Sequence, residues 1–352
     1  MKLINISTAT FLLLFSIPAH ALTLTEAINA SLANNLSIKI ENINVNLAEE
    51  DYFQTKSNYF PSIALSGSLS ENDYSNITTQ SGTTSSNYEL SPSSKSITVS
   101  QNIFSGFGRI YSSLSSKDML EVQNLTKLKV EQDITLETIE AYYNVLLAEK
   151  TTQSYKDNYE SVSERFKATS KEYEVGLASK TDVAQSEAFL NNAKIDLLDS
   201  KIQEKNIKNS FHNLTGIKPD NLVFSEIRES IPDTFDEYRE NVISNNFAIK
   251  IVNSTLDVLN SNIGIARSAL YPQVNLTASK TELDEFSATV DELTNEEIQA
   301  TVSWPIFTSG KSLSDVRKAK KQKNSQLILI QKTKNETLTS VSYTHLTLPT
   351  IG

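Results

Sequence analysis

The sequence contains no cysteine in its 352 residues, and it has few residues that break helices, with 9 glycines and 8 prolines. Without cysteine the chain has no disulfide, thiolate metal site, cysteine nucleophile or lipid-modified N-terminal cysteine. The scarcity of glycine and proline is typical of long helices rather than of a loop-rich enzyme. The net charge of −10 argues against nucleic acid as a partner, because phosphates require a basic surface.

No apolar run reaches the ~18 residues that a membrane-spanning helix requires, so the sequence predicts no transmembrane helix. Insertion into a membrane would then require strands closed into a barrel. The N-terminus has the order of a secretory signal, with Lys2, an apolar run over 11–17 and an A-x-A cleavage pattern ending at Ala21. We therefore expect residues 1–21 to be a signal peptide and the mature chain to begin near Leu22.

The longest regular feature is a run of about 65 residues, 109–173, without proline or glycine. At ~1.5 Å per residue it predicts a helix of roughly 95 Å, far longer than the mean of about 11 residues. Apolar residues follow coiled-coil spacing in two stretches that are out of phase: Leu136, Ile139, Tyr143 and Leu146, then Tyr155, Tyr159, Val162, Phe166 and Tyr173. Such a helix must pack against neighbours, because it cannot bury its apolar stripe alone.

A tip turn is expected over 174–181, followed by a return helix over 182–214. Glycine in this turn supplies the permissive backbone that a helix end needs. Thr181 or Asp182 is suited to be the N-cap of the return helix. The turn residues that the pattern singles out are Val175, Gly176 and Leu177. Taken alone, this segment fits a plain coiled-coil hairpin equally well.

Alternating segments before the long helix predict strands. Over 61–70 and again over 96–104, apolar residues alternate with small or polar ones, which is typical of strands with one wet and one apolar face. Residues 71–95 are rich in serine, threonine and asparagine and are expected to form an exposed loop. The turns at the start and end of the strand pair are marked by Pro61, Gly106 and Gly108.

The second half of the chain repeats this order. Asn34 matches Asn245 and Pro61 matches Pro272 at one and the same offset, whereas Ile103 matches Ile306 at a slightly smaller offset. A constant offset through helix, proline and strand indicates internal duplication, and the later decrease fits a deletion in a loop. Each repeat opens with a capping box, one starting at Thr23 and the other at Thr234.

We assign 22–220 to the first repeat, 221–233 to a connector and 234–340 to an incomplete second repeat. The second repeat is expected to hold strands over 272–280 and 298–307, an acidic exposed loop over 282–297, a turn at Gly310 and the start of another long helix. Residues 341–352 form an atypical tail, in which Pro349 would break a helix. We expect the chain to be truncated and this tail to be foreign or frame-shifted.

Four strands are too few for one chain to close a barrel, because eight is the smallest useful number. Several copies must therefore pool their strands. Three copies would contribute twelve, within the known range, and a dimer or tetramer also fits arithmetically.

Together these motifs resemble the TolC-type outer-membrane efflux and secretion channels. The resemblance covers about Leu22 to Ser340, and its most specific part is Val175-Gly-Leu-x-x-x-Thr181-Asp182-Val183. It implies a mainly α fold with a minor β part and an internal duplication. Long coiled-coil hairpins would form a periplasmic α-barrel, and four short strands would contribute to a shared transmembrane β-barrel.

The resemblance also implies a homotrimer in the outer membrane of a Gram-negative bacterium, extending into the periplasm. It would be the exit duct of a tripartite efflux or type I secretion system, for passive export of small molecules or polypeptides. Its partners would be a periplasmic adaptor (membrane fusion) protein, an inner-membrane pump of the RND or ABC type, and outer-membrane lipid. Thr181 and Asp182 match tip positions that hold the family's channel shut, and no cofactor, metal or catalytic residue is implied.

A competing hypothesis is a periplasmic coiled-coil structural or adaptor protein that never inserts into the outer membrane. The alternating strands in both halves count against it, because an adaptor has no need of them. An enzyme is less favoured still, since the sequence has no Walker loop, Rossmann fingerprint, HExxH or GxSxG element.

Overall fold

The computed structural model of the chain describes residues 21–75, 82, 87–224, 235–287 and 289–347. Nearly all of the predicted signal peptide, most of the connector, Thr234 and residues 348–352 lie outside the described residues. The chain divides into two compact units: Met1–Ile40 with Val130–Ser230, and Glu41–Lys129 with Ile231–Gly352.

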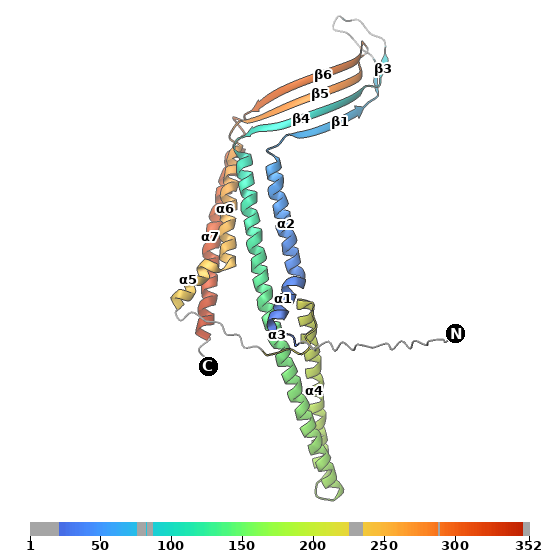
Figure 1. Cartoon of the computed structure of the whole chain (residues 1–352), viewed down its shortest axis with the longest axis vertical. Coiled ribbons are helices and arrows are strands. Elements are labelled where there is room, and N and C mark those ends of the chain that lie inside the picture. The colour runs from blue at the N-terminus through green and yellow to red at the C-terminus, as the bar shows by residue number, and fades with distance from the viewer. Residues whose placement is uncertain (1–20, 76–81, 83–86, 225–234, 288, 348–352) are drawn as a thin grey trace, which may run out of the picture. The chain divides into compact units, whose positions relative to one another are not determined.

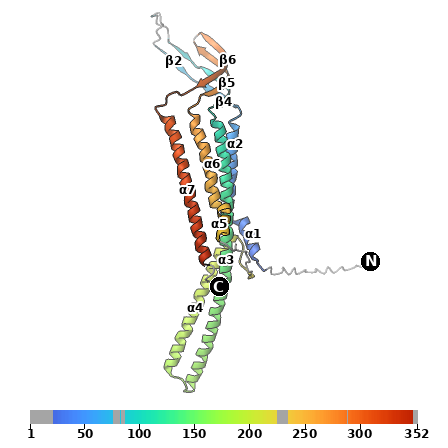
Figure 2. The ribbon, with the colours of Figure 1, turned by 90° about the vertical axis from the view of Figure 1, so that its left-hand side faces the viewer.

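Helices make up most of the first unit. These are α1 (Leu24–Asn34), the later part of α3 (Gly108–Glu174) and α4 (Lys180–Thr215). α3 and α4 run side by side and antiparallel, as Figures 1 and 2 both show. α1 begins with the expected capping box, since the Thr23 hydroxyl accepts from Glu26 N and the Glu26 carboxylate accepts from Thr23 N.

A small core joins α1, α3 and α4. Its fully buried members are Ala27, Tyr142, Val145 and Phe211. The Tyr142 hydroxyl lies 2.8 Å from Leu22 O and 2.6 Å from Val223 O and accepts a hydrogen bond from Val223 N at 3.1 Å. Burial raises the pKa of this phenol, although the hydrogen bond with the Val223 backbone opposes the rise. Tyr142 thus holds both backbone strands of the Leu22–Leu222 bridge against α3.

The buried seam of α3 differs from the predicted one. In this part of the helix the buried residues are Ile134, Thr138, Tyr142, Val145 and Ala148, whereas Leu136 is 58% exposed and Ile139, Tyr143 and Leu146 are half-buried. The prediction missed this line of residues because it passed over the polar Thr138 and the small Ala148, which continue the line through Ile134, Tyr142 and Val145. Thr138 is fully buried, since its hydroxyl donates to Ile134 O at 2.7 Å and leaves no unmet polar group.

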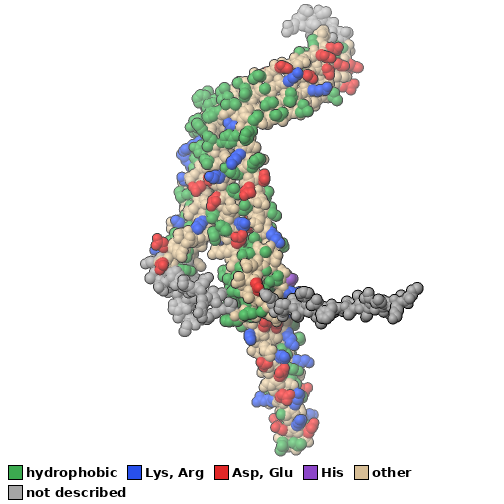
Figure 3. All heavy atoms as spheres, viewed as in Figure 1, with side chains coloured by type: hydrophobic (Ala, Val, Ile, Leu, Met, Phe, Trp, Pro, Cys, Tyr) green, Lys and Arg blue, Asp and Glu red, His purple; other side chains and the backbone are tan. Residues whose placement is uncertain are grey.

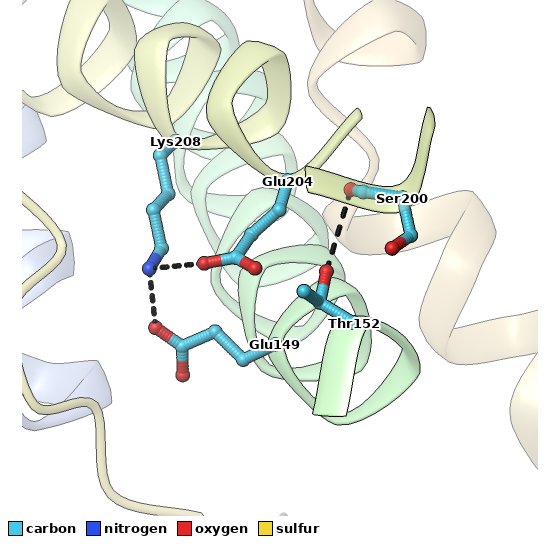
Figure 4. A network of polar contacts seen from close by, with 5 residues as sticks. All are labelled: Glu149, Thr152, Ser200, Glu204 and Lys208. Atoms are coloured by element: carbon cyan, nitrogen blue, oxygen red, sulfur yellow. Dashed lines mark hydrogen bonds and ion pairs between the residues drawn. The ribbon is translucent and has the colours of Figure 1, made fainter. Parts of the chain in front are cut away.

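One ion cluster fixes α4 against α3 (Figure 4). Lys208 Nζ lies 2.8 Å from Glu149 and 2.7 Å from Glu204, and Thr152 donates to Ser200 O at 3.3 Å. Burial alone would raise the pKa of Glu204, but hydrogen bonds with Lys208 and Thr152 hold it below its ordinary value. The pKa of Lys208 is raised despite burial, because two carboxylates face it.

The second unit contains α5 (Phe235–Asn245), α6 (Phe247–Ser268), α7 (Lys311–Thr347), most of α2 (Leu36–Ser57) and the start of α3. α6 and α7 lie side by side in Figures 1 and 2. Gly264 of α6 is packed under the Tyr111 ring of α3, where a methyl group would collide with the ring. The absence of a side chain at Gly264 therefore allows α3 and α6 to approach more closely than any other residue there would permit.

The element bounds reproduce the internal duplication. The bounds of α1 and α2 match those of α5 and α6, and the start of β1 matches that of β5, all at the offset that separates Pro61 from Pro272. The starts of α3 and α7 match at the smaller offset that separates Ile103 from Ile306. These are the two offsets of the sequence repeat, so the duplication extends to the element boundaries.

Four strands form one antiparallel sheet in the order β1-β4-β5-β6. They are β1 (Ser62–Leu69), β4 (Ser93–Ser105), β5 (Gln273–Ser287) and β6 (Val290–Ser303). The four strands pair within one chain but do not close on themselves, because among the described residues β1 and β6 pair on one side only. The sheet is therefore open, with two free edges.

Two predicted loops are partly strands. The acidic segment 282–297 was expected to be a loop, but β5 and β6 pair through most of it, as in Glu282 with Thr294. In the first polar loop, β2 (Asn72–Tyr74) pairs with β3 (Tyr88–Leu90), and the Tyr74 and Tyr88 rings stack at 5.0 Å. These predictions were wrong because the segments lack the apolar alternation of a half-buried strand. Their side chains instead interact across the strands, as Lys280 does with Glu296 at 3.4 Å.

Replacing Lys208 by Met should destabilise the α3–α4 hairpin by up to about 1 kcal/mol at neutral pH, because Glu149 and Glu204 would then face each other unneutralised. The pKa of Glu204 is lowered in the folded state, so its stabilisation is complete above its unfolded pKa and is lost as pH falls through the folded pKa. The free energies of unfolding of the wild-type chain and Lys208→Met, measured in urea, should therefore converge at acidic pH.

The matched control is Lys167→Met, because the Lys167–Glu164 pair is largely exposed. It should change stability little at any pH. An equal loss for the two variants, or a Lys208→Met loss that persists in acid, would contradict the role of the cluster.

Candidate functional site

One face of the sheet is apolar and exposed. Residues that are directly paired across the strands share one face of the sheet. The apolar side chains on this face include Ile63, Leu65, Leu69, Ile97, Val99, Leu276, Ile298 and Val302. Leu65, Leu69 and Ile298 are 83%, 88% and 81% exposed. Figure 3 shows hydrophobic side chains over the part of the sheet near α6 and α7, and acidic side chains gathered at its far end. An apolar surface of this kind requires a covering of lipid or protein.

The opposite face carries hydroxyl and amide groups. Ser68 and Ser94 hydroxyls lie 2.8 Å apart, and Ser96 and Thr281 hydroxyls lie 2.9 Å apart. Nearer the helices, Asn102 donates to Asn275 Oδ1 at 2.6 Å. In its part nearer the helices, the sheet thus has one face suited to a water-free environment and one suited to water, whereas the charged residues of the apolar face lie farther from the helices.

Left-handed backbone turns join strands to the long helices. Gly106 and Phe107 have φ of 60° and 70°, and Ser309 and Gly310 have φ of 51° and 80°. The two pairs are related by the same offset as Ile103 and Ile306, so the turn recurs in both repeats, with Phe107 rather than Gly106 corresponding to Gly310. Gly106 is required for a second reason, because a Cβ there would collide with Ser268 O.

The predicted prolines lie where helices lead into strands, and Gly108 lies where a strand leads into a helix. Pro61 and Pro272 directly precede β1 and β5, and Gly108 begins α3 against the Ser268 side chain. Arg109, which the prediction did not single out, donates to Asn58 O at 3.1 Å and to Ile103 O at 2.9 Å. It therefore ties the segment after α2 to β4 and the start of α3.

The tip turn ends α3 with a Schellman motif. Gly176 has φ of 79°, Gly176 N donates to Tyr173 O at 3.0 Å, and Leu177 N donates to Glu172 O at 2.8 Å. Two apolar side chains are left in solvent, with Val175 71% and Leu177 82% exposed. The helix thus ends at the glycine that the sequence singled out.

The N-cap of α4 is Ser179, so the expectation of Thr181 or Asp182 was wrong. The Ser179 hydroxyl accepts from Asp182 N at 3.2 Å, and Asp182 Oδ2 accepts from Ser179 N at 2.8 Å and from its hydroxyl at 2.7 Å. These hydrogen bonds lower the pKa of Asp182. The signal was readable, because serine followed three residues later by aspartate has the spacing of a capping box.

Thr181 lies in the first turn of α4 and is exposed. The tip residues belong to the first unit, and the strand turns belong to the second. Within the described residues, no three histidine, aspartate or glutamate side chains are arranged to hold a metal ion. No described helix has both the length and the apolar character needed to cross a bilayer.

Comparison with known proteins identifies the family. The family model described as "Outer membrane efflux protein" matches residues 27–216 and 239–349. The chain is 23% identical over 301 residues to the outer membrane efflux protein BepC of Brucella suis, covering 85% of this chain and 64% of BepC. It is 20% identical to the alkaline protease secretion protein AprF of Pseudomonas aeruginosa, covering 53% of this chain and 41% of AprF. The chain thus spans less than two thirds of the length of these curated relatives.

The solved CmeC outer membrane channel of Campylobacter jejuni has the same fold. It superposes with a TM-score of 0.74 at 19% identity, over 88% of this chain and 67% of CmeC. The predicted fold class, mainly α with a minor β part, is confirmed, and so is the resemblance on which it rested. Both the family and the fold are those of outer-membrane channels rather than of enzymes, and the chain belongs to the outer membrane efflux protein family.

Proposed function

We propose that this chain forms, as a homotrimer, the outer-membrane exit duct of a tripartite efflux or type I secretion system. Export through it is passive, and an inner-membrane pump of the RND or ABC type drives it. Relatives named for efflux and for protease secretion support both substrate classes, small molecules and polypeptides.

The observation that carries this proposal is the open, two-faced sheet. In lipid, the unpaired backbone groups along β1 and β6 would each cost several kcal/mol. Neighbouring strands in the sheet are antiparallel throughout, so β1 and β6 run in opposite directions and β6 of one copy suits β1 of the next. Three copies pooled in this way give twelve strands, a number within the range of outer-membrane barrels.

An exposed stripe on α2 supports association of copies. Leu36, Ile40, Ile43 and Leu47 are 72%, 56%, 58% and 59% exposed. Their spacing of four, three and four residues is that of a coiled-coil seam. Covering this stripe by a helix of another copy would bury apolar surface that one chain leaves in water.

The tip supports docking and closure. Val175 and Leu177 offer an apolar contact for a periplasmic adaptor. Thr181 and Asp182 would hold neighbouring copies together while the duct is closed, and partner binding would shift that balance. The periplasmic structural alternative is disfavoured, because it assigns no role to the apolar face of the sheet.

Detergent extraction from outer membranes tests the duct. We expect a particle with the mass of three copies, since each copy alone leaves two strand edges unpaired. Native mass spectrometry and light scattering both measure this mass. A monomeric species released without detergent would contradict the proposal.

Replacing Asp182 by Ala should increase antibiotic uptake by cells and raise single-channel conductance, because contacts that close the duct would be lost. Ser179→Ala is the matched control, since it also removes the hydrogen bond from the Ser179 hydroxyl to Asp182 Oδ2 but keeps the carboxylate. If both variants increase uptake equally, Asp182 acts only through the helix cap. No increase for Asp182→Ala would exclude the gating role.

A further inference from the structure

The charged residues of the paired sheet are divided unequally between its faces. Over the paired stretches 62–69, 93–105, 273–284 and 292–303, the register places nearly all of them on the apolar face: Lys95, Lys280, Glu282, Asp284, Glu292 and Glu296. The hydroxyl- and amide-bearing face holds one charged residue in these stretches, Glu297. Every other polar group on that face is neutral.

The position of Glu297 follows from the register. Glu297 is opposite Ser279, Ser279 is opposite Thr98, and Thr98 is opposite Ala64. Residues directly opposite in an antiparallel sheet share a face. Glu297 is therefore level with the body of the sheet, well below the β5–β6 turn.

Its neighbour Glu296 has a different environment. Glu296 lies on the apolar face, where Lys280 Nζ is 3.4 Å from its carboxylate and 3.7 Å from that of Glu282. In the described part of the chain no lysine or arginine forms an ion pair with Glu297, and the side chain is exposed. Glu296 thus shares one lysine with Glu282 on the apolar face, whereas Glu297 has no ion-pair partner among the described residues on the polar face.

We propose that Glu297 sets the charge preference of the pore, making it favour cations and cationic substrates over anions. This rests on the proposed duct, in which the apolar face contacts lipid and the polar face lines the lumen. Closure by identical copies places one Glu297 per copy at the same level, which makes a ring of carboxylates in a wall whose paired stretches carry no other charge on this face. Such a ring raises the local concentration of cations and lowers that of anions.

The effect depends on ionic strength. Charges on the wall act across a water-filled lumen, where the Debye length is about 10 Å at 0.1 M salt and about 3 Å at 1 M. The preference for cations should therefore be strong in dilute salt and weak in concentrated salt.

The test is the reversal potential of the purified protein in planar bilayers under a KCl gradient. The wild-type pore should favour K⁺, and Glu297→Gln should lower the K⁺/Cl⁻ permeability ratio by about twofold or more in dilute salt. Glu296→Gln is the matched control, because it removes the same charge from the adjacent residue on the opposite face. An unchanged ratio for Glu297→Gln, or equal changes for the two variants, would overturn the inference.

Thiol labelling gives a second readout that does not depend on opening of the tip. The chain has no cysteine, so a single Glu297→Cys variant is labelled only at this site. In proteoliposomes it should react with a water-soluble thiol reagent, whereas Ile298→Cys, on the apolar face, should be shielded by lipid. Equal labelling of both, or protection of Glu297→Cys, would contradict a lumenal Glu297.

The two tests separate this inference from the proposed function. If no conductance and no trimer are found, the duct itself is wrong, and the inference is overturned with it. If a trimeric pore conducts but its ion preference is unaffected by Glu297→Gln, only the inference fails.

Discussion

The structure depends on a sheet that one chain cannot complete. Four strands give an apolar face with side chains such as Leu65 and Ile298 more than 80% exposed, and two edges with unpaired backbone groups. Exposing the apolar face to water is unfavourable, and so is exposing the unpaired backbone groups of the edges to lipid. In the proposed barrel, closure by further copies would cover the apolar face and pair the strand edges, and the exposed α2 stripe is a second surface that a neighbouring copy would cover.

Local backbone geometry and capping set where several helices begin and end. The left-handed residue pairs Gly106–Phe107 and Ser309–Gly310 connect a strand to the long helix that follows it in each repeat. At the tip, Gly176 ends α3 and the Ser179–Asp182 capping box begins α4 only a few residues later. The Lys208 cluster then holds the two helices together. The duplicated chain thus repeats the same left-handed turn after the sheet in both halves, and the Lys208 cluster stabilises the α3–α4 hairpin of the first half.

The sequence predicted much of this architecture because its strongest signals are local. The absence of proline and glycine over 109–173 predicted α3, and the constant offsets predicted the duplication. Predictions failed where the burial of a polar side chain or the pairing of two strands decides the structure. Thr138 is buried because its hydroxyl bonds within the helix, and the polar ends of β5 and β6 are strands because they pair with each other. Glu297 stands out only when the register is known, since neighbouring Glu296 has the same side chain on the opposite face.

The most direct measurement of the central claim is a disulfide between copies, formed from one cysteine on β1 and one on β6. The two strands are at opposite edges of the same four-stranded sheet, so within one chain β4 and β5 separate them. Oxidation of this double variant in native membranes should give a covalently closed trimer on denaturing gels. Monomers that cross-link only within themselves, or that stay uncross-linked, would contradict a barrel shared among copies.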